Sequence, residues 1–232
     1  KPLDAAQVAM AAKRLSEMAV EAVAVCFLHS YANPEHERRA AEIVSQAMPG
    51  VPVSVSSDIL PEYREFERFS TTALNAYVGP KVSQYLDRLA SSLTDQNIEA
   101  PLRIMGSNGG TWSAAAMAAE PVNAMLSGPA GGVTASVGIA RLLERPNIIT
   151  YDMGGTSTDA CLIRNYAYGM TTEGHVGMWP NRAPQIEIKT VGAGGGSIAY
   201  LDPGKFLNVG PRSAGALPGP ACYGRGGTEP TV

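Results

Sequence analysis

The residues best suited to chemistry concentrate in one short segment, Asp152-Met-Gly-Gly-Thr-Ser-Thr-Asp159. Strand-forming residues at 148–151 lead into it, and residues 160–163 leave it as a second strand. Two glycines, Gly154 and Gly155, allow a tight turn between the strands. The sequence therefore predicts a β-hairpin whose tip presents backbone amides and hydroxyl groups, with a carboxylate on each side.

Such a tip suits a polyphosphate whose charge is balanced by Mg²⁺. We expect the backbone of Gly154 to Ser157 and the Thr156 hydroxyl to hold phosphate oxygens. Asp152 would hold the metal, through its bound waters. An ordinary Gly-Gly hairpin is the alternative interpretation, but two acids and three hydroxyls within eight residues favour phosphate binding.

Two further glycine turns are candidates for the same site. The first follows an expected strand at 102–106 and precedes an expected helix from Ser113, which is where α/β folds bind anions. A plain loop is equally compatible with it. The second follows an expected strand at 186–191, and a tight turn into the strand at 198–201 is its alternative. Their candidate binding residues are Ser107, Asn108, Gly109, Gly110, Gly194, Gly195, Gly196 and Ser197.

The elements that position these turns alternate between helix and strand. We expect helices at 4–19 and 35–48 and strands at 22–28 and 51–55, a pattern that predicts an α/β fold. The continuous apolar run at 22–28 is typical of a strand buried on both faces of a parallel sheet.

A long helical pattern opens after Pro61. Gly79-Pro80 interrupts it, which predicts two helices or one kinked helix. Its apolar stripe is expected to pack in the core; the stripe comprises Tyr63, Phe66, Phe69, Ala73, Tyr77, Val82, Tyr85, Leu86, Leu89 and Leu93.

Small residues dominate the next expected helix, 133–143, which begins after residues 127–132. They suit a close contact between two lobes, or equally a helix packed against its own sheet. Residues 202–232 are rich in glycine and proline, and a linker and an ordered loop lining a cleft both remain open.

Composition narrows the function classes. The chain has 232 residues, of which 45% are hydrophobic and 17% charged, so it can bury a substantial core. A net charge of −3 lacks the excess of positive charge that is typical of nucleic-acid-binding domains. Apolar runs are too short for a membrane span, and no signal peptide is visible. Three scattered cysteines, Cys26, Cys161 and Cys222, indicate reduced thiols in a cytoplasmic protein.

Other potentially reactive side chains give weaker signals. His29 and His36 are interpreted as structural or solvated residues. His175, in a polar glycine-rich loop, is the histidine that we would test as an acid or base. Cys222 could act as a nucleophile, but no nearby motif supplies its base.

Taken together, the sequence resembles the hydantoinase A/5-oxoprolinase family. The matching motifs follow the family's order across nearly the whole chain. They are Ser30-Tyr-Ala-Asn-Pro-Glu-His-Glu37, Ser107-Asn-Gly-Gly110, Leu126-Ser-Gly-Pro-Ala-Gly-Gly132, Asp152-Met-Gly-Gly-Thr-Ser-Thr-Asp159, Val191-Gly-Ala-Gly-Gly-Gly-Ser-Ile198, Val209-Gly-Pro-Arg-Ser-Ala-Gly215 and Pro218-Gly-Pro-Ala-Cys-Tyr223.

This resemblance implies two ribonuclease H-like lobes of the actin-like ATPase type. Residues 1–145 would finish the first lobe, including a connecting helix, and residues 146–232 would begin the second. The family's earlier phosphate motif near its N-terminus is absent, and the chain starts without Met. We therefore expect an internal piece of a longer protein that does not turn over ATP alone.

The implied activity is ATP-dependent hydrolysis of a cyclic amide such as 5-oxoproline or an N-methylhydantoin, with ATP and Mg²⁺ as cofactors. Asp152 and Thr156 would be catalytic, and Asp159 would support the metal or orient the nucleophile. A B-type hydantoinase subunit is the expected partner. Two alternatives stay open: a subunit of an ATP-dependent ketone carboxylase, and a non-catalytic module switched by nucleotide.

Overall fold

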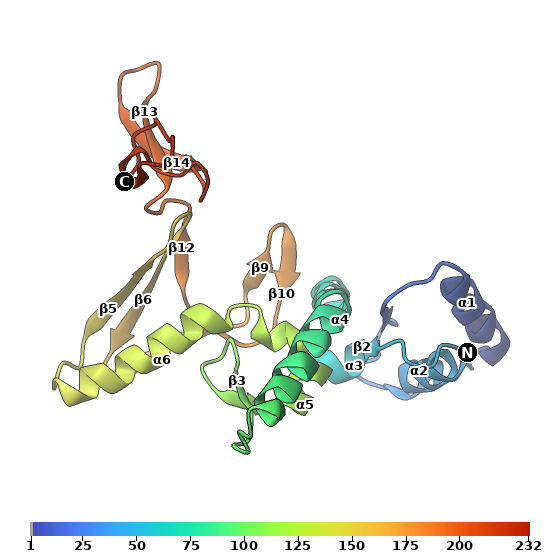
Figure 1. Ribbon diagram of the computed structural model, residues 1–232. Coiled ribbons are helices and arrows are strands. Elements are labelled where there is room, and N and C mark those ends of the chain that lie inside the picture. Colours follow the sequence, from blue (N-terminus) through green and yellow to red (C-terminus); the bar gives the residue numbers. More distant parts are fainter. Residues whose placement is uncertain (1) are drawn as a thin grey trace. The chain divides into compact units, whose positions relative to one another are not determined.

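The computed structural model describes residues 2–232, which form two compact units. The first unit comprises the chain as far as Ser127 together with Thr171–Gln185. The second comprises Gly128–Met170 and Ile186–Val232. Both contain helices and strands (Figure 1), in agreement with the predicted α/β class. The lobe boundary at residues 145 and 146 stays a prediction.

The first unit is built around a small parallel sheet. Strands β1 and β2 pair in parallel, and α1 and α2 pack against them through a core that includes Ala12, Val25 and Val44. Asp4 caps α1 by accepting the amide N–H groups of Ala6 and Gln7 at 3.1 Å. The elements of this unit are α1 (Ala5–Glu17), β1 (Val23–Val25), α2 (Glu35–Ala47), β2 (Val53–Val55), α3 (Ser56–Ile59), α4 (Glu65–Asp95), β3 (Arg103–Met105), β4 (Thr111–Ser113), α5 (Ala114–Ala119), η1 (Pro121–Ala124), β9 (Gly174–Val176) and β10 (Trp179–Asn181).

Strand β1 is shorter than the apolar run that predicted it. Val23 and Val25 are buried, but Ala24 between them is exposed. The expectation that this strand is buried on both faces is therefore wrong for the described residues, in which the two-stranded sheet has one covered face.

Helix α4 decides between the two predicted arrangements. It continues through Pro80 as a single helix of 31 residues, so Gly79-Pro80 does not divide it into two helices. The predicted core stripe is wrong for its aromatic members Tyr63, Phe66 and Tyr77, which are 64%, 61% and 82% exposed, whereas Leu86 of the stripe is buried. The buried face is largely polar and comprises Arg68, Ser70, Thr71, Thr72, Asn75, Gly79 and Leu86.

Hydrogen bonds explain why a polar face can be buried there. Asn75 donates to the Ser54 hydroxyl at 3.0 Å and accepts the Val122 amide N–H at 3.1 Å. The Ser70 hydroxyl donates to the Pro180 carbonyl at 2.8 Å. Satisfied polar groups carry little desolvation penalty, so this face joins α4 to its neighbours without an apolar stripe.

The second unit packs one helix against an antiparallel sheet. Strands follow the order β12-β6-β5, and β7 pairs with β6. Ala130 and Val133 of α6 contact a core that contains Cys161 and Ile163 of β6. Its elements are α6 (Ser127–Leu142), β5 (Ile148–Met153), β6 (Thr158–Arg164), β7 (Ala167–Tyr168), β12 (Lys189–Val191), β13 (Ser197–Leu201), β14 (Leu207–Ser213) and η2 (Ala221–Tyr223).

Short strands mark the places where the chain passes between the units. β8 (Met170–Thr171) pairs with β11 (Gln185–Ile186), so the strand expected at 186–191 is divided between β11 and β12. Residues beyond 202 are ordered: β14 pairs with β13, and the Ala214 amide donates to the Gly196 carbonyl at 2.8 Å. Among the described residues, no helix is long and apolar enough to cross a membrane.

Candidate functional site

The predicted phosphate hairpin is present in the second unit. β5 and β6 pair in antiparallel register from Ile148 opposite Ile163 to Met153 opposite Thr158. Residues 154–157 form the turn, here called the hairpin tip, and the Gly154 amide donates to the Ser157 carbonyl at 2.9 Å. Neither glycine of the tip lies in the left-handed region, so the turn itself does not explain them.

A second loop packs against the hairpin tip. Residues 192–197, here called the glycine loop, lie against the hairpin tip through backbone hydrogen bonds. The Gly195 amide donates to the Gly154 carbonyl at 2.9 Å, and the Gly196 amide donates to the Gly155 carbonyl at 2.7 Å. The structure therefore brings together two segments that the sequence analysis assigned to one site.

Contact between the two loops is too close for side chains. A Cβ atom on Gly194 would lie 2.5 Å from the Gly154 carbonyl oxygen and 2.8 Å from the amide nitrogens of Thr156 and Ser157. On Gly196 it would lie 2.8 Å from the Gly155 oxygen. These glycines are required by close approach of the backbone rather than by an unusual φ.

Side-chain hydroxyls hold the glycine loop in place. Thr158 donates to the Ala193 carbonyl at 2.6 Å. Ser197 is fully buried, and its hydroxyl accepts the Gly194 amide N–H at 2.8 Å. Ser197 therefore supports the loop from inside rather than offering its hydroxyl to a ligand.

Two carboxylates flank the hairpin tip. Asp152 and Asp159 are direct cross-strand partners, so their side chains share one face of the sheet. Asp152 is exposed and Asp159 half-buried. The Thr190 hydroxyl of β12 donates to Asp159 Oδ1 at 2.6 Å. Sequence reasoning missed Thr190, because nothing in its motif distinguishes it from an ordinary strand threonine.

The hairpin tip also offers unused donors. The amide N–H groups of Gly155, Thr156 and Ser157 make no hydrogen bond to the rest of residues 2–232. The hydroxyls of Thr156 and Ser157 likewise have no partner in this part of the chain. Consecutive free amides beside hydroxyls are the donors that anion-binding turns provide.

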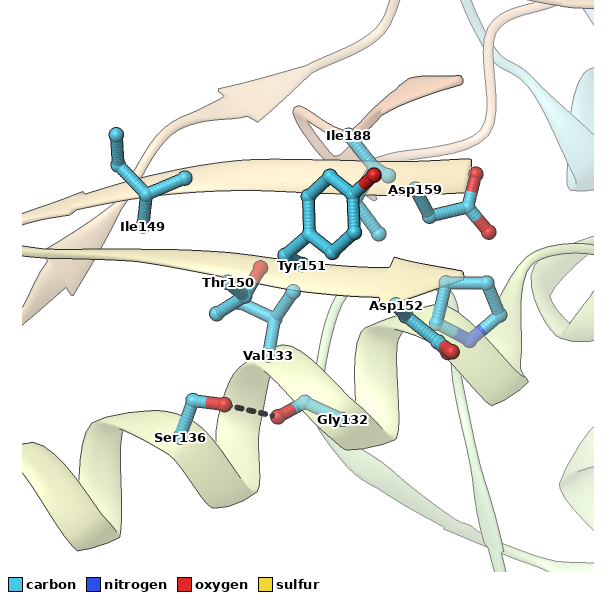
Figure 2. A pocket seen from close by; sticks show the side chains of 10 residues that line it. Gly132, Val133, Ser136, Ile149, Thr150, Tyr151, Asp152, Asp159 and Ile188 are labelled. Atoms are coloured by element: carbon cyan, nitrogen blue, oxygen red, sulfur yellow. Dashed lines mark hydrogen bonds between the residues drawn. The ribbon is translucent and has the colours of Figure 1, made fainter. Parts of the chain in front are cut away.

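A groove of about 380 Å³ is lined by residues of α6 and of strands β5 and β6, including Asp152 and Asp159. Figure 2 shows α6 along one side, with Gly132, Val133 and Ser136, and the hairpin along the other. Asp152 and Asp159 lie at the same end of the groove in this view. The groove therefore combines apolar walls with a carboxylate end.

Other predicted binding residues lie in the first unit. The Ser107 hydroxyl is buried, donates to the Asn123 carbonyl at 2.8 Å and accepts the Leu126 amide N–H at 3.0 Å. Asn108 Oδ1 accepts the Gly110 amide N–H at 2.9 Å, and Gly109 has a φ of +79°. These bonds maintain the turn at 107–110, and its contact with phosphate stays a prediction.

The remaining candidates are isolated. His175 is exposed on β9, and Cys222 is exposed on η2. No cluster of three or more His, Cys, Asp or Glu residues that could hold a metal occurs within residues 2–232. A pair of carboxylates nevertheless fits Mg²⁺, which keeps several waters and is commonly held by one or two acids together with substrate phosphates.

Comparison with known proteins identifies relatives of this chain. The Hydantoinase/oxoprolinase family model matches residues 68–232, and the Hydantoinase/oxoprolinase N-terminal region matches residues 1–48. Caprolactamase subunit alpha of Pseudomonas jessenii is 42% identical over 100% of this chain, which covers 33% of that protein. 5-Oxoprolinase 1 of Arabidopsis thaliana is 36% identical over 98% of this chain and 18% of its own length.

Two solved structures also resemble this chain. The crystal structure of ATP-dependent caprolactamase from Pseudomonas jessenii matches all of this chain and 34% of its own, with a TM-score of 0.87 and 42% identity. Nucleotide-free acetone carboxylase matches 99% of this chain and 33% of its own, with a TM-score of 0.78 and 31% identity. The chain thus spans about a third of the length of the caprolactamase and acetone carboxylase chains, and 18% of the length of 5-oxoprolinase 1. It belongs to the hydantoinase/oxoprolinase family.

Proposed function

We propose that this chain is part of an ATP-dependent enzyme that hydrolyses cyclic amides. The observation that carries the proposal is the hairpin tip, where free amides lie between two facing carboxylates. Caprolactamase and 5-oxoprolinase, two relatives of this chain, are named for cyclic amides. The caprolactamase of known structure is described as ATP-dependent.

The carboxylate pair supports a bound cation. Two acids directly opposite each other across a hairpin repel, and a divalent cation between them and the phosphates relieves that repulsion. In our proposal Asp152 holds Mg²⁺ through its waters, and Asp159 lies beside it. The amides of the hairpin tip and the Thr156 hydroxyl hold the phosphate oxygens.

The chemistry follows from the poor electrophilicity of a lactam. MgATP supplies a phosphoryl group, which transfers to the amide oxygen and leaves ADP. Water would then add to the activated carbonyl carbon, and departure of the ring nitrogen with a proton would break the C–N bond and leave an acyl phosphate. A second water would hydrolyse this acyl phosphate to the carboxylate and inorganic phosphate. The residues of this chain position the phosphates and neutralise the charge that develops on them.

The proposal extends to the complete protein. We place the hairpin in the second lobe of an actin-like ATPase, with residues 1–145 completing the first lobe. A separate subunit of the B type is the proposed partner, because the caprolactamase relative is itself a subunit. Three free cysteines support a reducing, cytoplasmic location.

A second candidate is carboxylation of a ketone. It is favoured by the similarity to acetone carboxylase, whose structure this chain matches over 99% of its length. The two reactions would share activation by ATP but differ in the group that accepts the phosphoryl group. Bicarbonate dependence therefore distinguishes them.

The decisive experiment measures phosphate release from ATP by the protein expressed from its complete gene, together with its partner subunit. Caprolactam, 5-oxoproline, N-methylhydantoin, and acetone with bicarbonate are supplied in turn. Asp152→Asn tests the hairpin, and Asp87→Asn, an exposed acid on α4, is the matched control.

We expect one cyclic amide to stimulate phosphate release, and we expect Asp152→Asn to reduce turnover by roughly 100-fold or more because the developing charge loses its metal. Asp87→Asn should leave turnover unchanged. Stimulation that requires bicarbonate would select the carboxylase instead. Slow turnover that is insensitive to every substrate and to Asp152→Asn would overturn the proposal and leave the nucleotide-switched module.

A further inference from the structure

Three polar side chains form a row across the sheet of the second unit. Asp152 on β5 is the cross-strand partner of Asp159 on β6, and Asp159 is the partner of Thr190 on β12. Direct partners in antiparallel strands point to the same face. The row therefore begins with two carboxylates and ends with one hydroxyl.

The hydroxyl at the end of this row fixes the carboxylate at its centre. Thr190 Oγ1 donates to Asp159 Oδ1 at 2.6 Å, the length of a hydrogen bond to an ionised carboxylate. A β-branched side chain has few χ1 options in a strand, so the hydroxyl is held in place before the acid binds anything. Asp159 Oδ2 makes no hydrogen bond to the described residues and stays available for a ligand.

Neighbouring bonds keep Thr190 from moving away. Thr158, the residue before Asp159, donates to the Ala193 carbonyl at 2.6 Å, three residues after Thr190. Lys189 and Val191 pair with Ala160 and Thr158 on either side of the row. β12 is thus fastened to β6 on both sides of Thr190, and the orientation of Asp159 depends on the position of that strand.

We propose that Thr190 is a positioning residue that orients the Asp159 carboxylate toward the cation held with Asp152. This inference rests on the proposed function for the identity of the cation–nucleotide ligand. Asp159 had two possible roles, support of the metal and orientation of the nucleophile. The inference selects the first, because a carboxylate with one oxygen fixed by a donor is preorganised as a metal partner. Orienting partners of this kind typically contribute 10- to 100-fold to metal affinity.

The test uses Thr190→Val and Thr190→Ser in the protein expressed from its complete gene. Valine keeps the branched shape and the strand preference but removes the hydroxyl, whereas serine keeps the hydroxyl. Thr171→Val is the control, since its hydroxyl only accepts the Glu173 amide N–H. Binding of Mn²⁺ with a non-hydrolysable ATP analogue is followed by electron paramagnetic resonance, and hydrogen exchange of β6 and β12 is followed without metal.

We expect Thr190→Val to weaken Mn²⁺ binding about 10-fold, and Thr190→Ser to stay within about twofold of wild type. Exchange in β6 and β12 should match wild type in both variants, which shows that the sheet is intact. Wild-type affinity in Thr190→Val would overturn the inference. Equal losses in the valine and serine variants would also overturn it, because packing and not the hydroxyl would then matter.

Failure of the proposed function gives a different result. If wild-type protein binds no Mn²⁺–nucleotide, or binds it equally well as Asp152→Asn, the phosphate site itself is wrong and so is the role of Thr190. If binding depends on Asp152 but not on Thr190, only the positioning role is wrong.

Discussion

The two units hold their key turns by opposite means. In the first unit, charged side chains stabilise the backbone that follows β1. Glu37 is fully buried and accepts the Phe27 amide N–H at 2.5 Å and the Ser57 amide N–H at 2.8 Å. Arg68 is also fully buried and donates to the Phe27 carbonyl at 2.8 Å. The Ser56 hydroxyl joins them, donating to Glu37 at 2.7 Å and accepting from Arg68 at 3.1 Å.

The second unit uses backbone contacts where the first uses charged side chains. The glycine loop and the hairpin tip bond amide to carbonyl, with no room for a Cβ on Gly194 or Gly196. A site that must leave amides open for a ligand cannot fill the space with side chains. Buried charges instead suit a turn that must be rigid without exposing its backbone.

The largest effect should come from removing Arg68. Arg68→Ala removes the donor of the Phe27 carbonyl and of the Ser56 hydroxyl. Glu37 keeps its own donors, but it becomes a buried charge without the buried cation that is linked to it through Ser56. We expect a loss of about 3–5 kcal/mol in the first unit. Hydrogen exchange of peptides from β1, β2 and α4 measures it, with peptides from β5 and β6 as the internal reference.

Arg38→Ala is the matched control for Arg68. Its side chain is 60% exposed and pairs with Asp58 on the surface. An exposed pair of this kind contributes about 0–1 kcal/mol. Equal effects of the two arginine substitutions would contradict the idea that the first unit depends on a buried polar network.

The next effect concerns the glycine loop. Gly194→Ala forces a Cβ to within 2.5 Å of the Gly154 oxygen, so the loop and the hairpin tip must separate. We expect about 1–3 kcal/mol of local destabilisation in the second unit, measured by hydrogen exchange of β5, β6 and β12. Gly192→Ala is the control, because its Cβ would meet no atom within 4 Å. Matching behaviour of the two variants would refute the close-packing explanation.

This contrast shows how much of the fold could be predicted. Helical periodicity predicted α1, flanking prolines marked α2, and the hairpin motif predicted β5 and β6. The helix expected at 133–143 is α6, which begins earlier, at Ser127. The sequence predicted the helix α4 but not which of its faces is buried. Aromatic spacing favoured Phe66 and Tyr77 as core residues, and they are exposed while Arg68 is buried. Partners distant in sequence decide that outcome, and periodicity carries no information about them.

The candidate site, too, could be predicted only in part. Glycine clusters and flanking acids mark a backbone-built site in the sequence itself, so the hairpin tip and the glycine loop were predictable as separate segments. Their membership of one site was also predicted, but the backbone contact between them was not, because it depends on the register of β12 against β6. Thr190 was missed for that reason: its role arises only when the register places it beside Asp159.

A smaller effect on the stability of the first unit is expected when the pH is lowered. Burial raises the pKa of Glu37, but hydrogen bonds from Ser56, Phe27, Ser57 and Ser30 outweigh burial and lower it below its ordinary value of 4.5. A carboxyl group whose pKa is lowered by folding stabilises the folded state above the unfolded pKa. That stability is lost as the pH falls through the folded value.

Glu37→Gln should therefore destabilise the first unit by about 1–2 kcal/mol at pH 7. The difference from wild type should persist down to about pH 5.5 and shrink below pH 4.5. Urea titrations of both proteins between pH 7 and pH 3 measure it. A difference that is constant over this range would show that the charge of Glu37 contributes nothing.

The smallest expected effect is on the alkylation rate of Cys26, which reports on the negative charge of Glu37. Burial and, next, the negative charge of Glu37 raise the pKa of the Cys26 thiol to about 11. At pH 8 roughly one thiol in a thousand is then ionised, so alkylation by iodoacetamide should be slow. Exposed Cys222 should react first.

Glu37→Gln removes one cause of the raised pKa and should speed alkylation of Cys26 while leaving the rate at Cys222 unchanged. If both cysteines accelerate together, the substitution has opened the fold and the charge of Glu37 is not what protects Cys26.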